Sequence, residues 1–282
     1  MDVILATAST LPRPDEDDAP LRAALAERGL SAQTCAWDDP AVDWAQARVC
    51  VIRSTWNYVR SHARFLGWVE SCAAVTRLWN PAAIVRWNSH KRYLLELMQA
   101  GLPVVPTRLV PAGGVADLVE LAGDWTEVVI KPAVSAGSFS TVRVARADFA
   151  SAGQAHVDGL LAGAHDVLVQ PFLRSVESYG ERALVWIDGA LTHAVRKSPR
   201  FAGDPQRVSE AVAIAPDEAA LAESILAAVV RQPLLYARVD LARDERGRPC
   251  LMELELIEPS LFLDRSPVAL ARLAAAIQRL AG

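Results

Sequence analysis

Three glutamates lie close together in the stretch LMELELIEP at residues 251–259. In an extended strand, residues two apart point to the same face, so Glu253 and Glu255 lie side by side and Met252 faces the other way. Two neighbouring carboxylates repel each other unless a cation neutralises them, and Mg²⁺ prefers such oxygen ligands. The stretch by itself fits two structures equally well, a magnesium site or a solvent-facing strand edge with two harmless charges.

A second strand is expected at YARVDL, residues 236–241, and a turn at DERGRP, residues 244–249. The turn makes this strand the antiparallel partner of the glutamate stretch. Asp240 can then share one face of the sheet with Glu253 and Glu255.

A lysine followed by small residues offers a second kind of site. The strand EVVIK at 127–131 ends on Lys131, the segment AVSAGSFS covers 133–140, and TVRVAR at 141–146 alternates like another strand. Backbone N–H groups in such a loop can cradle phosphate oxygens while the lysine supplies charge. The pattern is not a Walker A loop, because no GxxxxGK[ST] is present and no helix follows. The alternative is a hairpin turn with a surface lysine.

Another lysine lies where a positive charge is unfavourable. The spacing predicts a helix over residues 88–100, NSHKRYLLELMQA, with Lys91 in its first turn. A cation there lies next to the positive end of the helix dipole, which indicates an anionic ligand. A solvated lysine is the alternative.

A buried strand, DVLVQ at 166–170, leads into Pro171, Phe172 and Leu173. A short apolar linker with free backbone N–H and C=O groups can bind the edge of an adenine base. Glu177 follows at a distance suited to ribose hydroxyls.

The N-terminal third alternates strands and a helix. Strands are expected at 2–7, 31–36 and 47–53, with a helix at 20–28, which suggests a small parallel sheet. Ligands bind at the carboxyl ends of such strands, and Arg53 stands at one. Its guanidinium suits a substrate carboxylate, or equally a structural role against loop carbonyls.

Length, charge and cysteine spacing narrow the range of functions that the chain could have. The 282 residues suggest two or three subdomains, and the net charge of −4 gives no electrostatic footprint for nucleic acid. No apolar run approaches the ~18 residues of a membrane span, and the N-terminus lacks the basic region of a signal peptide. The four cysteines show no CxxC or metal-binding spacing, which favours reduced thiols and a cytoplasmic location.

Taken in chain order, these pieces resemble the ATP-grasp superfamily. The order is Lys91, Lys131 with its small loop, the QPFL linker, Glu177, and then Asp240, Glu253 and Glu255. The chain resembles a glutathione synthetase-like subgroup more closely still. The motifs that carry this resemblance are RSTWNY at 53–58, KPAVSAGS at 131–138 and ELELIEPSLF at 253–262. That subgroup includes the O-ureido-serine cyclo-ligase of cycloserine biosynthesis. The subgroup has Asp where this chain has Asn57 and His90. Because these positions are expected near the substrate or the lobe boundary, the difference leaves the substrate of this chain open.

The resemblance implies a mixed α/β and α+β architecture of the ATP-grasp type. An N-terminal Rossmann-like domain is expected at residues 1–80, a central lobe at 81–170 and a C-terminal lobe with the metal site at 171–282. The two α+β lobes would enclose ATP between them.

The implied activity is that of an ATP-dependent, ADP-forming ligase. A carboxylate would be activated as an acylphosphate and joined to an amine or another nitrogen nucleophile, intramolecularly in a cyclo-ligase. The expected partners are small amino-acid-like molecules, without nucleic acid or membrane, and a homodimer is allowed. The alternatives are a small-molecule kinase that stops at phosphorylation and a nucleotide-binding module without catalysis.

The resemblance also implies roles for individual residues. The residues expected to bind ATP are Lys91, Lys131, Ser135, Ala136, Gly137, Ser138, Gln170, Phe172, Leu173 and Glu177. The expected ligands of Mg²⁺, for which Mn²⁺ can substitute, are Asp240, Glu253 and Glu255. Arg196 would face the transferring phosphate, and Arg53 and Arg182 are candidates for the substrate carboxylate.

Overall fold

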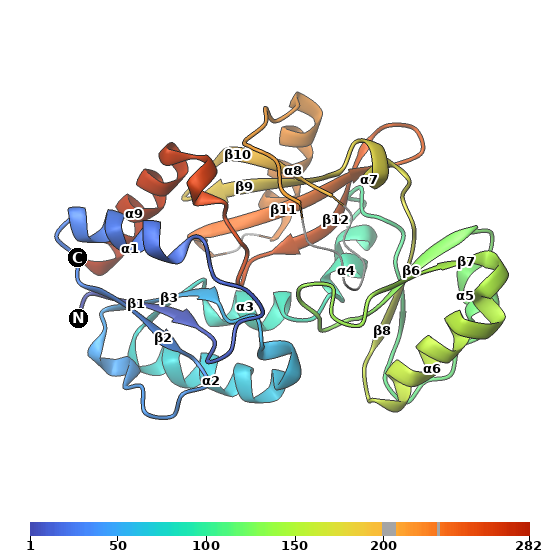
Figure 1. Ribbon diagram of the computed structural model, residues 1–282, viewed down its shortest axis with the longest axis horizontal. Coiled ribbons are helices and arrows are strands. Elements are labelled where there is room, and N and C mark those ends of the chain that lie inside the picture. The colour runs from blue at the N-terminus through green and yellow to red at the C-terminus, as the bar shows by residue number, and fades with distance from the viewer. Residues whose placement is uncertain (199–206, 230–231) are drawn as a thin grey trace.

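Three four-stranded sheets make up the described part of the chain (Figure 1). The structure is a computed structural model that describes residues 1–198, 207–229 and 232–282. One sheet is parallel and N-terminal, and the other two are antiparallel.

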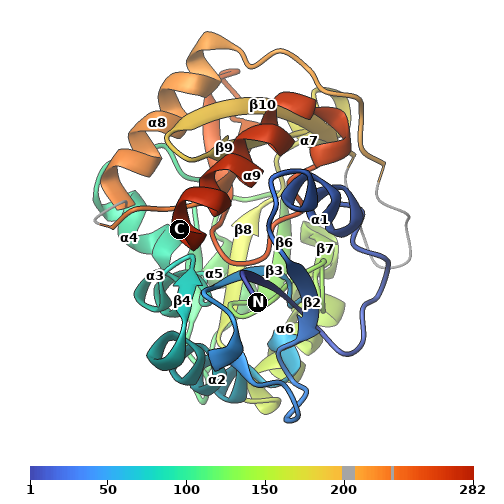
Figure 2. The same cartoon turned by 90° about the vertical axis from the view of Figure 1, so that its left-hand side faces the viewer.

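The N-terminal sheet has the strand order β2-β1-β3-β4. Its strands are β1 (Val3–Thr7), β2 (Ala32–Ala36), β3 (Val49–Ser54) and β4 (Arg77–Trp79). Alternate residues of β1 and β3 enter two cores, because successive side chains of a strand point to opposite faces. One core includes α1 (Asp18–Glu27) and α9 (Pro267–Ala281), and the other includes α2 (His62–Val75) (Figure 2).

The C-terminal sheet has the order β10-β9-β11-β12. Its strands are β9 (Glu181–Ile187), β10 (Ala190–Lys197), β11 (Tyr236–Arg243) and β12 (Pro249–Glu255). Helix α9 packs on one face, and α3 (Ala82–Asn88), α4 (Tyr93–Gln99) and α8 (Pro216–Val229) contribute to the core on the other. The final helix therefore joins the N-terminal and C-terminal sheets.

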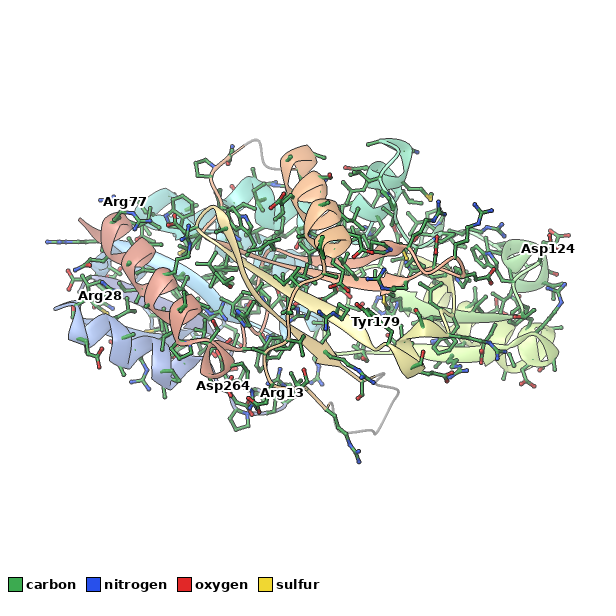
Figure 3. The ribbon with its side chains drawn as sticks, turned by 90° about the horizontal axis from the view of Figure 1, so that it is seen from above. Arg13, Arg28, Arg77, Asp124, Tyr179 and Asp264 are labelled. Carbon is green, nitrogen blue, oxygen red and sulfur yellow. The ribbon has the colours of Figure 1, made fainter. Side chains whose placement is uncertain are left out.

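The third sheet has the order β5-β8-β6-β7 and a core of its own, drawn from residues 110–169. Its elements are β5 (Arg108–Val110), α5 (Leu118–Ala122), β6 (Glu127–Pro132), β7 (Val142–Ala145), α6 (Gln154–Ala162) and β8 (Val167–Pro171). Figure 3 shows this lobe extending away from the rest, with Asp124 at the end farthest from Arg28 and Arg77.

Short helical segments connect these elements. They are η1 (Trp44–Gln46), η2 (Tyr58–Arg60), η3 (Arg146–Asp148), the π-helical η4 (Phe149–Gly153), α7 (Ser175–Ser178) and η5 (Leu263–Arg265). Within the described residues, no helix has both the length and the apolar character that crossing a membrane requires.

The single helix expected over 88–100 is wrong. The chain forms α3 and α4 instead, and Lys91 lies in the turn between them. The Asn88 side chain is bonded to the backbone of Leu254 and Leu256, and the Lys91 N–H donates to the carbonyl of Ala133. These long-range bonds replace the helical ones.

The domain boundaries expected at residues 80 and 170 stay a prediction. The cores follow a different division, because α3 and α4 pack with the C-terminal sheet rather than with the lobe of β5 to β8.

Candidate active site

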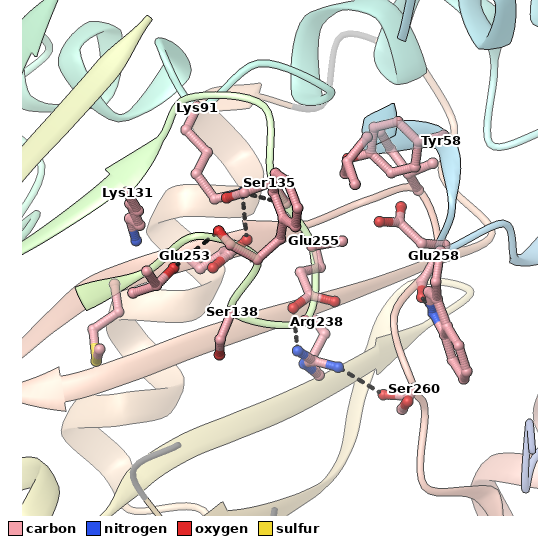
Figure 4. A pocket seen from close by; sticks show the side chains of 18 of the residues that line it. Tyr58, Lys91, Lys131, Ser135, Ser138, Arg238, Glu253, Glu255, Glu258 and Ser260 are labelled. Carbon is pink, nitrogen blue, oxygen red and sulfur yellow. Dashed lines mark hydrogen bonds and ion pairs between the residues drawn. The ribbon is translucent and has the colours of Figure 1, made fainter. Parts of the chain in front are cut away.

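A cavity of about 830 Å³ lies where the three sheets meet (Figure 4). The antiparallel sheets contribute the charged side chains of Lys131, Lys197, Arg238, Glu181, Glu253 and Glu255, and Lys91 reaches the cavity from the turn between α3 and α4. The N-terminal part contributes Arg13, Trp37, Asp38, Trp56, Asn57 and Tyr58 from segments after its strands, and Arg64 from α2. Figure 4 shows Lys91 and Lys131 on one side of this space and Tyr58 and Glu258 on the other.

The carboxylates of β12 lie at the cavity as the strand pattern predicts. β11 and β12 pair antiparallel, with Asp240 opposite Glu253 and Arg238 opposite Glu255. The register shifts after Asp240, so Met252 has no partner across the sheet and forms a bulge. The bulge explains why Met252, expected on the opposite face, also lines the cavity.

Each of these acids has a cationic partner. Lys91 Nζ lies 3.1 Å from Glu253 Oε1, and Arg238 pairs with Glu255. Asp240, which is 1% exposed, receives Lys197 Nζ at 2.7 Å and Arg238 Nε at 2.8 Å. A neighbouring cation therefore neutralises each of these three acids.

The pKa values reflect this pairing. Burial favours the neutral acid, but Arg238 and Lys197 hold the pKa of Asp240 well below its usual range. Burial likewise opposes ionisation of Glu253, yet Lys91 and Lys131 lower its pKa. For Glu255 burial prevails over Arg238 and raises the pKa to about 7, and Asp240 adds to the rise.

The small-residue loop has residues with positive φ and a run of backbone N–H groups that have no acceptor among the described residues. Gly137 and Ser138 have φ values of 58° and 63°, and the carbonyl of Ser135 accepts a hydrogen bond from Lys91 Nζ at 2.5 Å. In the described structure no hydrogen bond engages the backbone N–H groups of residues 135–138. Successive unpaired N–H groups form a concave surface that attracts anions. Lys131 lines the same space, and burial lowers its pKa.

The linker after β8 reaches the cavity but is only partly free. Gln170 donates to Thr107 Oγ1 at 2.8 Å, and the Phe172 N–H donates to the carbonyl of Glu127 at 2.9 Å. The Leu173 carbonyl accepts from Val176. Among the described residues, the N–H of Leu173 has no acceptor and remains available to a ligand.

Known structures share this arrangement. The RimK domain ATP-grasp protein of Sphaerobacter thermophilus superposes with a TM-score of 0.72 at 22% identity, over 98% of this chain and 99% of that one. The D-alanine–D-alanine ligase of Bacillus anthracis complexed with ATP gives 0.73 at 14% identity, over 100% and 97%. At these identities the likeness concerns the fold, and it confirms the expected ATP-grasp architecture.

One relative is much closer in sequence. The family model described as the N-terminal domain of D-cycloserine synthetase DcsG matches residues 3–80. The cycloserine biosynthesis protein DcsG of Streptomyces lavendulae is 36% identical over 283 residues, 93% of each chain. The crystal structure of D-cycloserine synthetase DcsG has a TM-score of 0.90 at 34% identity and covers 99% of this chain and 100% of that one.

The chain belongs to the DcsG family of ATP-grasp ligases. It is accordingly an ATP-using, ADP-forming ligase, as the resemblance implies, rather than a kinase or a non-catalytic nucleotide-binding module. The individual residues of this ATP-grasp site still have to be placed from its own geometry.

The structure does not bring the three candidate arginines to the ATP-grasp cavity. Arg53 is 3% exposed and donates to Asp17 at 3.2 Å and to the carbonyl of Pro259. These contacts correspond to the structural role that was the alternative to binding a substrate carboxylate. Arg182 pairs with Glu218 in the same buried manner. These two cations are already neutralised in the interior and are not reachable by a substrate.

Arg196 points away from the cavity, because the alternation along β10 exposes it and buries its neighbour Lys197. It donates to the carbonyl of Ser178 at 2.9 Å. The side chain at the cavity is Lys197, which the sequence analysis missed. Lys197 lies two residues after buried Val195, so the two-residue period of a strand predicts that both side chains point to the same, buried face.

Glu177 is also displaced from its expected role. It does not line the cavity, and its carboxylate lies 2.6 Å from Arg143 at the surface. Glu181, at the start of β9, lines the cavity instead and pairs with Lys197. Burial raises the pKa of Glu181 to about 7.

The donor set fits a divalent cation in part. Within the described residues, no three acidic, histidine or cysteine side chains converge as a ready ligand cluster. Glu253 and Glu255 do face the cavity, whereas both oxygens of Asp240 are engaged below its surface. The chemistry of the two glutamates suits Mg²⁺, with further oxygens coming from phosphate.

Proposed function

We propose that ATP binds with its base against residues 170–173 and its phosphates between Lys91, Lys131 and the loop of residues 135–138. The observation that carries this proposal is that residues 135–138, whose backbone N–H groups make no hydrogen bond in the described structure, line the same cavity as Lys91 and Lys131. Glu181 replaces Glu177 as the residue for the ribose hydroxyls, since it lines the cavity.

Glu253 and Glu255 would hold Mg²⁺, and Asp240 fixes Lys197 and Arg238 beside them. When bound, the metal neutralises phosphate charge and orients the γ-phosphate. Lys91 exchanges its contact with Glu253 for a phosphate oxygen, which frees that glutamate. Positioning and charge neutralisation of this kind dominate phosphoryl transfer.

The substrate carboxylate attacks the γ-phosphate, which gives an acylphosphate and ADP. Arg238, which lines the cavity next to Glu255, is placed to stabilise the transferring group. A nitrogen nucleophile then attacks the acyl carbon, and inorganic phosphate leaves. The loop at residues 135–138 excludes water, because hydrolysis of the acylphosphate would waste the ATP.

We infer further that the nucleophile belongs to the same molecule as the carboxylate, which makes the enzyme a cyclo-ligase. The relative of 36% identity is named for cycloserine biosynthesis, and the likeness extends over 93% of both chains. The proposed substrate is O-ureido-D-serine, in line with the O-ureido-serine cyclo-ligase subgroup that the motifs resemble. Homodimer formation and cytoplasmic location stay predictions.

Incubation of the purified protein with O-ureido-D-serine, ATP and Mg²⁺ tests this proposal. Ring closure through the oxygen-bound nitrogen first leaves the carbamoyl group on that nitrogen, and water must then remove it as CO2 and ammonia. ADP release together with D-cycloserine or its N-carbamoyl form, identified by mass, is the expected result. ADP release with an open-chain product and no ring would refute the proposed cyclisation, and no ADP release above the substrate-free rate would refute the proposed substrate.

A further inference from the structure

The acidic side chains that line the cavity differ in whether a cation or a hydrogen-bond donor contacts their carboxylates. Glu253, Glu255 and Glu181 each pair with a lysine or arginine. Asp38 accepts hydrogen bonds from Ser9 and Asn57. In the part of the chain that the structure describes, no side chain donates to the carboxylate of Glu258, although Glu258 lines the cavity and is largely buried.

An unpaired carboxylate in such surroundings is destabilised as an anion. Burial raises the pKa of Glu258 to about 8, and the nearby charge of Glu255 contributes to the rise. A cationic ligand would relieve both effects. Lys91 and Lys131 lie across the cavity from Glu258 (Figure 4), and Lys91 contacts Ser135 and Glu253.

We propose that Glu258 is a specificity-determining residue that binds the ammonium group of an amino-acid substrate. The inference rests on the proposed function, since it assigns a residue to the acid that this ligase activates. A charge-assisted hydrogen bond between ammonium and carboxylate is stronger than a neutral one.

The position of Glu258 fits the geometry of an α-amino acid. It follows β12 by three residues, in the segment whose Ser260 carbonyl accepts a hydrogen bond from Arg238 at 3.1 Å. The activated carboxylate must lie near Arg238 and the phosphates. We place the ammonium group on the neighbouring carbon toward Glu258, because Glu258 and Arg238 line the same cavity.

The wall around Glu258 is suited to a cation. Trp56 Nε1 donates to the Glu258 carbonyl at 2.9 Å, so its ring is fixed next to this residue. Tyr58 lies on the same side of the cavity and is 4% exposed (Figure 4). Arg13 already lies over the Trp56 ring, with its Cζ 4.4 Å from the ring centroid, so these aromatic side chains contribute by excluding water that would otherwise weaken the ion pair.

A four-way kinetic comparison tests the inference. Wild type and Glu258→Gln are assayed for ADP release with O-ureido-D-serine and with its desamino counterpart, 3-(ureidooxy)propanoate. Glu258→Asp, which keeps the charge, checks for misfolding. Glu245→Gln is the matched control, because Glu245 is exposed in the turn between β11 and β12.

We expect kcat/KM of Glu258→Gln for the amino acid to fall by about 10- to 150-fold, the range for a hydrogen bond to a charged group. The desamino acid should be turned over equally by both enzymes, and KM for ATP should not change. Glu258→Asp should retain part of the preference for the amino acid.

Two results would overturn the inference. If Glu258→Gln reduces turnover of both acids by the same factor, Glu258 acts in proton transfer or in folding. If wild type uses the desamino acid as well as the amino acid, no ammonium site exists. If wild type instead rejects O-ureido-D-serine but uses another amino acid from a panel, the proposed substrate fails, and the same comparison with that amino acid and its desamino form decides the role of Glu258.

Discussion

Replacing Glu253 by Gln tests the exchange of partners that nucleotide binding requires. In the present structure the Glu253 carboxylate lies 3.1 Å from Lys91 Nζ, and the two side chains are 29% and 7% exposed. The substitution removes one negative charge and keeps the shape. Two effects of opposite sign follow, one on ATP alone and one on ATP with Mg²⁺.

Without metal, Glu253 repels the phosphates and competes for Lys91. Two unit charges about 8 Å apart interact by ~2 kcal/mol at an effective dielectric constant of ~20. Partial exposure of Glu253 reduces this to about 1 kcal/mol, or roughly fivefold in Kd. Glu253→Gln should therefore bind metal-free ATP about fivefold more tightly.

With Mg²⁺, the same substitution removes a proposed metal ligand. Turnover should fall by about 10²-fold or more, the effect of losing one key electrostatic contact in a transition state. Calorimetric titration of ATP in EDTA and in Mg²⁺, together with ADP release, measures both effects, and Glu245→Gln serves as the surface control. A folded Glu253→Gln enzyme with wild-type turnover would refute the metal role, and weaker metal-free ATP binding would refute the competition for Lys91.

Four further predictions follow, one on the nucleotide, two on the loop and one on the interior. Mg-ATP should raise Tm by mass action while NAD does not, and the reverse would contradict an ATP site. Gly137→Val should raise KM for ATP or lower kcat more than Gly137→Ala, because a β-branched residue disfavours a φ of 58° although no atom lies within 4 Å of the added Cβ. Residues 133–141 should exchange amide hydrogens more slowly with a non-hydrolysable ATP analogue, and equal exchange would show an ordinary turn. Asp17→Asn should lower the free energy of unfolding by about 3 kcal/mol in urea titration, because Arg53 loses its buried partner, and a change below about 1 kcal/mol would contradict that role.

Much of the site follows local rules that a sequence reveals. The alternation in β12 predicts that Glu253 and Glu255 share a face, and the short turn before it predicts the pairing that places Asp240 opposite Glu253. The lysine and small residues after β6 predict a loop rather than a helix, and the loop is there. Each of these features depends on neighbours within about one hairpin.

The arginines could not be assigned in the same way, because their roles depend on distant partners. Arg53 is neutralised by Asp17, whose carboxylate also accepts the N–H groups of Leu261 and Leu263 from the far end of the chain. Lys91 is likewise held out of a helix by Ala133 and Ser135. Contacts of this range leave no periodic pattern in the sequence.

The alternation of side chains along β10 distinguishes Arg196 from Lys197. Both cations end β10, and a two-residue period assigns only one of them to the buried face. Lys197 there contacts Asp240 and Glu181, so a lysine in the interior is neutralised by two acids. The burial of these acids raises the pKa of Glu181 but not that of Asp240, because Asp240 has Arg238 as a second cation. Of the two acids that hold Lys197, Glu181 therefore gains a proton more easily, and the charge of Asp240 stays fixed.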